Sequence, residues 1–153
     1  MPLVLKLMEI TLKAKANFIF FPENKTPNPV RAAIAIYWIA LAVFVVRFCL
    51  ELRALPFSVP KAAMIVVFGL LFAVLIFEAF TIARLSYGKL WARNVVLFST
   101  AFAIVTTAYS LFANGLHAQQ NDAIGLISVA AETVAGLFLL TSKSTAWFKS
   151  KIK

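Results

Sequence analysis

Three ionisable side chains interrupt apolar stretches of this sequence, and any chemistry carried out within a membrane would begin with them. Glu132 lies at the centre of AIGLISVAAETVAGLFLLT, residues 123–141, and Glu78 and Arg47 lie in two other apolar runs. A charged group at the centre of a membrane helix costs about 2.5–3.5 kcal/mol on insertion scales, so such a group faces other helices or a polar partner. We therefore expect Glu132 to face other helices rather than lipid.

Glu132 has several polar or small residues at helical spacing. Ser128 and Gly136 share its helix face, at i−4 and i+4. If neighbouring helices are antiparallel, Thr106 or Thr107 of the preceding apolar run lies at a comparable depth. One hypothesis is a structural glutamic acid, neutral and hydrogen-bonded to a hydroxyl, because burying an unpaired charge is costly. Another is that Glu132 contacts a membrane helix of a partner protein.

Glu78 suggests a third hypothesis for the role of Glu132. It lies about one and a half turns inside the second apolar run, so Glu132 and Glu78 could form two stations of a proton or cation relay. Arg47 has two interpretations of its own. Glu51 follows it by one helical turn, so the two can pair at the interface, or Arg47 can snorkel outward. A ligand-binding arginine is the alternative.

The remaining reactive residue types do not form an enzyme motif. His117 is the only histidine and has no nucleophile or metal-ligand partner at motif spacing. Cys49 is the only cysteine, which excludes an intramolecular disulfide and a thiolate metal cluster. No phosphate-binding glycine loop and no H-E-x-x-H occur. We expect neither catalysis, nor a metal, nor a cofactor.

The elements that would position these residues are four long apolar runs. The 153-residue chain is 62% hydrophobic and 14% charged, whereas soluble domains are near 45–50% apolar and 25% charged. About 20 apolar residues span a bilayer as a helix. The pattern predicts an all-α integral membrane four-helix bundle over residues 32–141, with spans at 32–50, 62–83, 95–113 and 123–141.

Three shorter segments complete the expected domain organisation. Residues 1–21 alternate apolar and charged positions at helical spacing, which predicts an amphipathic helix on the membrane surface or against a partner. Residues 22–31 hold three prolines and predict a linker. Residues 142–153 predict a basic cytoplasmic tail.

The distribution of charge predicts the orientation. Twelve of the fifteen Lys and Arg residues lie in residues 1–31, in the 84–93 connection and in the C-terminal tail. The positive-inside rule therefore places both termini in the cytoplasm. Trp38, Trp91, Trp147 and Arg93 are the expected interfacial anchors. The net charge of +9 flanks apolar spans without a nucleic-acid motif, so anionic lipid head groups are the expected partner and nucleic acid is not.

Two motifs resemble those of small, largely uncharacterised bacterial four-helix inner-membrane proteins. These are GKLWAR at residues 88–93 and FLLTSKSTAWFK at residues 138–149, and the entry PNPVRAAIAIYW at residues 27–38 is also similar. The resemblance covers roughly residues 27–149. It implies a four-helix fold in the bacterial inner membrane and no specific activity. The long amphipathic start departs from the short polar lead usual in that set.

Three function classes agree with these features. The first is a non-enzymatic accessory protein that binds another membrane component, either a partner protein or further copies of itself. The second is a small proton- or cation-coupled carrier that uses Glu132. The third is an immunity protein against a pore-forming toxin, which rests on topology alone. Glu132→Gln separates the first two, because a carrier would lose activity whereas a structural glutamate would tolerate the isostere.

Overall fold

The computed structural model describes residue 22 and residues 25–53, 61–114 and 123–151. The predicted surface helix at residues 1–21 lies outside the described residues, and so does His117. The described residues form helices only, α2 (Asn28–Arg53), α3 (Lys61–Ser86), α4 (Leu90–Asn114), α5 (Ala123–Leu140) and α6 (Ser142–Ser150). The first four are long and apolar enough to cross a membrane. The prediction of a four-helix membrane bundle is confirmed, and the chain is a multi-pass membrane protein.

The first membrane helix begins four residues earlier than the predicted span, which starts at residue 32. α2 starts at Asn28, inside the predicted 22–31 linker, with Pro29 in its first turn. Proline fits there because the N–H groups of the first turn have no partner within the helix. The Pro27 carbonyl accepts hydrogen bonds from the amides of Val30 and Arg31, at 3.0 and 3.1 Å. The linker prediction is therefore wrong for its last four residues.

The connection between α3 and α4 is much shorter than the predicted segment 84–93. α4 starts at Leu90, so only residues 87–89 separate the two helices. Gly88 adopts a φ of 72°, the left-handed region that lets the chain reverse in so few residues. The Gly88 amide donates to the Leu85 carbonyl at 2.9 Å, and the Lys89 amide donates to the Arg84 carbonyl at 3.2 Å. These bonds close the end of α3 with a tight turn.

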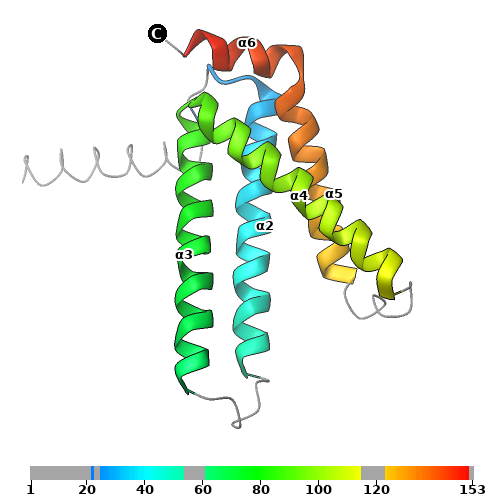
Figure 1. Cartoon of the computed structure of the whole chain (residues 1–153). Coiled ribbons are helices and arrows are strands. Elements are labelled where there is room, and N and C mark those ends of the chain that lie inside the picture. Colours follow the sequence, from blue (N-terminus) through cyan, green and yellow to red (C-terminus); the bar gives the residue numbers. More distant parts are fainter. Residues whose placement is uncertain (1–21, 23–24, 54–60, 115–122, 152–153) are drawn as a thin grey trace, which may run out of the picture.

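The four long helices form a closed ring in which each contacts two neighbours, in the order α2, α3, α4, α5 and back to α2. Figure 1 shows α2 beside α3, and α4 crossing in front of α2 and α5. The two pairs converge at the end near α6 and diverge toward the other end. The ring therefore packs tightly at the α6 end and loosely at the opposite end.

The protein core follows this asymmetry. Its fully buried large side chains are near the α6 end and include Ile34, Leu85, Leu139 and Phe148. Elsewhere the helices expose large apolar side chains, such as Phe112 at 91%. In a bilayer such side chains contact lipid, which is as apolar as they are. Their exposure agrees with a membrane-spanning bundle.

The predicted basic tail forms a helix that closes the packed end of the bundle. Thr141 caps α6, with its hydroxyl oxygen accepting from the Ser144 amide at 3.4 Å. The Ser144 hydroxyl, fully buried, donates to the Phe138 carbonyl at 2.7 Å. α6 contacts both α5 and α2. Residues 142–150 therefore belong to the folded unit.

Candidate functional site: a cavity between the four helices

Each long helix contributes one polar residue at a similar depth. Tyr37, Glu78, Thr100 and Glu132 are eight to ten residues from the helix ends next to α6. At 1.5 Å per residue this is about 12–15 Å along each helix. The four residues define what we call the polar layer.

The polar layer borders a cavity of about 560 Å³, within the range of small-molecule sites. All four long helices line it. Its polar and charged lining residues are Tyr37, Arg47, Glu78, Thr81, Ser99, Thr100, Thr106, Thr107, Ser128 and Glu132, and the remaining lining residues are apolar or glycine. The cavity is therefore amphipathic, with ionisable groups set in apolar walls.

Tyr37 links three helices within the polar layer. Its hydroxyl shares a 3.0 Å hydrogen bond with the Thr100 hydroxyl of α4 and donates to the Glu132 main-chain carbonyl of α5 at 3.4 Å. Gly136 lies beside this contact, and a Cβ there would be at an ordinary contact distance of 3.7 Å from the Tyr37 hydroxyl oxygen. The network closes the cavity on the side of the core.

The exposed fractions of the lining residues indicate which side of the cavity is closed. Ile82 and Val96, beside the core, are 5% and 6% exposed, whereas Phe44 and Ile124 are 44% and 58% exposed. The second pair lies farther from α6 along α2 and α5. The cavity is thus closed toward α6, whereas its lining is exposed from the depth of Glu78, where Phe77 is 53% exposed, to the diverging helix ends.

Glu78 and Glu132 reach this cavity from opposite corners of the ring. α3 and α5 are not ring neighbours, yet both carboxylic acids line the cavity, and both are partly buried. The sequence analysis identified both residues, and the structure shows that they line the same cavity.

A hydroxyl partner for the Glu132 carboxyl group stays a prediction. Thr106 and Thr107 line the cavity, but the hydroxyl that bonds to Glu132 is that of Tyr37, which donates to the main-chain carbonyl and also bonds to Thr100. The Thr106 hydroxyl instead bonds to carbonyls of its own helix, at 3.0 Å.

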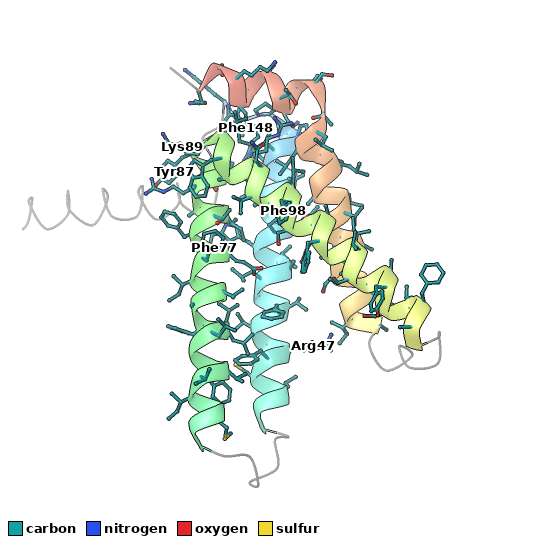
Figure 2. All side chains as sticks on the ribbon, viewed as in Figure 1. Arg47, Phe77, Tyr87, Lys89, Phe98 and Phe148 are labelled. Carbon is teal, nitrogen blue, oxygen red and sulfur yellow. The ribbon has the colours of Figure 1, made fainter. Side chains whose placement is uncertain are left out.

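Arg47 lies at the opposite end of the cavity from the polar layer. It is ten residues beyond Tyr37 on α2, about 15 Å along the axis. Figure 2 shows it far from α6, on the side of α2 that faces α5. It lines the cavity, which agrees with the ligand-binding interpretation. The side chain of Glu51 lies outside the described residues, so the local ion pair stays a prediction.

Two of the expected interfacial anchors, Arg93 and Trp147, make contacts within the protein. Arg93 donates from Nη2 to the Thr145 hydroxyl at 3.0 Å, and its guanidinium lies 5.5 Å from the Phe148 ring. Trp147 packs beside Gly88, where a Cβ would lie 3.0 Å from Cη2. The two motifs at residues 88–93 and 138–149 therefore contact each other and hold α6 in place.

The other two tryptophans differ in burial. Trp38 is partly buried against the core, whereas Trp91 is 44% exposed with its ring 6.1 Å from that of Phe80. Only Trp91 presents much of its ring to the surroundings. Trp38 contributes mainly to packing.

Sequence reasoning missed Tyr37, Thr100 and Thr145 as site or packing residues. No local pattern distinguishes them, because each acts through a partner more than 50 residues away. In the described part of the chain, no three His, Cys, Asp or Glu residues are grouped as metal ligands require. Comparisons with protein-family models, curated proteins and solved structures gave no match.

Proposed function

We propose that this membrane protein is a small carrier that binds an organic cation in the cavity and exchanges it for protons on Glu78 and Glu132. The observation that carries the proposal is the shared cavity. Two carboxylic acids from non-adjacent helices line one space of about 560 Å³ within the membrane-spanning region. Neither an accessory protein nor an immunity protein requires such a space.

The chemistry follows from the cost of charge in an apolar region. An ionised carboxylate there needs a cationic partner or a proton. A bound organic cation and bound protons are therefore alternative ways of neutralising the same pair. Phe44 and Phe77 also line the cavity, and aromatic faces attract organic cations. Binding of one species favours release of the other.

The one-sided opening supports a carrier rather than a channel. The core closes the cavity toward α6, and the lining is exposed toward the other end. Transport would need a second conformation in which the α6 end opens. The Tyr37–Thr100 bond is the contact that such a conformation would have to break.

We place the protein in a bacterial inner membrane with both termini in the cytoplasm, so that the cavity opens away from the cytoplasm. Basic residues at the α6 end support this orientation through the positive-inside rule. In the described part they are Lys25, Arg31, Arg84, Lys89, Arg93, Lys143, Lys149 and Lys151. They would also bind anionic lipid head groups.

Calorimetry with octyltrimethylammonium tests the proposal. The full chain in lipid nanodiscs should bind this cation, and Glu132→Gln and Glu78→Gln should each weaken binding at least about tenfold, since each removes one charge partner. Cys49→Ser, at an exposed position outside the cavity, should bind like the wild type. Absence of binding, or equal affinity in the Gln variants, would contradict the proposal. If the chain does not bind the cation but co-purifies with a partner protein at a fixed stoichiometry, the accessory class is favoured.

A further inference from the structure

The cavity has charges of opposite sign at its two ends. Glu78 and Glu132 belong to the polar layer, whereas Arg47 lies about 15 Å along the α2 axis from Tyr37 of that layer. The carrier proposal uses only the acidic end. Arg47 lines the same cavity, so a ligand that fills the cavity lengthwise meets a cationic side chain at this end.

The walls between the two ends are suited to an extended apolar chain. Val43, Phe44, Val74 and Phe77 line the cavity, and Ser128 supplies a hydroxyl between Glu132 and the α5 start. Arginine and glutamate side chains reach several ångströms from their Cα atoms, so their charged groups can lie closer together than the helix positions that carry them. A ligand that contacts both therefore needs charged groups roughly 10 Å apart, less than the axial distance between the anchoring residues.

We propose that the ligand of this cavity is an elongated zwitterion, with its cationic group at Glu78 and Glu132 and its anionic group at Arg47. The inference rests on the proposed function for the cationic end and adds the anionic end. A guanidinium has five N–H donors, so Arg47 can hold a protein contact and a ligand carboxylate or phosphate together.

Charge complementarity favours this class over simpler ligands. A purely cationic ligand leaves Arg47 without a ligand anion, and a purely anionic ligand is repelled by the two carboxylates. A phospholipid head group with adjacent charges is too short to reach both ends. The zwitterion neutralises both ends at once and places its alkyl chain against the apolar walls.

Three matched probes test the inference in nanodiscs that hold the full chain. They are 8-(trimethylammonio)octanoate, octyltrimethylammonium and octanoate, which share one chain and differ only in their charged ends. The wild type should bind the zwitterion about tenfold more tightly than the cation, because it gains one charge-assisted hydrogen-bonded pair. Octanoate should bind weakest.

Arg47→Gln should abolish the preference for the zwitterion and leave the affinity for octyltrimethylammonium unchanged or slightly higher. Retained cation binding also shows that the variant is folded. Arg31→Gln, which removes an exposed arginine from the other end of α2, should keep the full preference. The inference is wrong if the wild type does not prefer the zwitterion, or if Arg47→Gln keeps that preference. Failure of the carrier proposal is distinct, since Glu132→Gln would then leave cation binding unchanged.

Discussion

Glu78 on α3 and Glu132 on α5 line one cavity although their helices occupy opposite corners of the four-helix ring. In the proposed carrier, a ligand cation in this cavity competes with protons on the two carboxyl groups, because each neutralises the same negative charges. This relationship leads to a prediction about pH.

Binding of octyltrimethylammonium should tighten as pH rises, because fewer protons then occupy the two carboxyl groups. Proton release on binding, measured by calorimetry in buffers of different ionisation enthalpy, should be larger for the wild type than for Glu132→Gln or Glu78→Gln. The double variant should show no release. Equal release from the wild type and both single variants would show that the carboxyl groups do not take part.

Tyr37→Phe should destabilise the bundle, since it removes the bonds to the Thr100 hydroxyl and the Glu132 carbonyl. Hydrogen bonds between membrane helices contribute about 0.6 kcal/mol on average and up to about 1.7 kcal/mol. Thr100→Val should cost a similar amount, and adding it to Tyr37→Phe should cost little more. Equilibrium unfolding in mixed SDS micelles measures all three variants. Additive losses would mean that the two hydroxyls act independently.

Gly88→Ala and Gly136→Ala should behave differently. At Gly88 the φ of 72° disfavours alanine by about 1–2 kcal/mol, and the new Cβ would lie 2.9 Å from Lys151 Cγ and 3.0 Å from the Trp147 ring. At Gly136 the nearest atoms are 3.6 Å away, an ordinary contact distance. The same unfolding assay should show a loss for Gly88→Ala and almost none for Gly136→Ala. The reverse order would contradict this packing.

Arg93→Gln should loosen α6, because it removes the bond to Thr145 and the contact with the Phe148 ring. Trypsin should then cleave faster at Lys143 and Lys149. Arg84→Gln is the matched control, since it also removes one tryptic site and its guanidinium lies over the Phe80 ring of its own helix. Similar cleavage rates in the two variants would show that Arg93 does not hold α6.

The proposed orientation predicts which positions a membrane-impermeant thiol reagent reaches in intact cells. In a Cys49→Ser background, Lys89→Cys at the α3–α4 turn should react only after permeabilisation. Ala123→Cys at the start of α5 should react from outside. Both positions are exposed. The opposite labelling pattern would place the termini outside the cytoplasm.

The four membrane helices could be predicted because apolar content is a property of each segment alone. The helix ends were less accurate. Pro29 suggested a linker, yet proline is compatible with a first turn, and the basic residues around Gly88 suggested a long connection where a three-residue turn suffices. Hydrophobicity sets the length of a span, whereas turn chemistry sets where it starts.

The sequence by itself determined the all-helical membrane class and the polar residues within its spans, including Glu78, Glu132 and Arg47. Only the tertiary structure decided that these three share a cavity, that Tyr37 bonds to Thr100, and that Arg93 holds α6 through Thr145. The physical reason is that helices apolar on every side carry no signal of which face meets a neighbour. That choice depends on contacts between residues far apart in the chain.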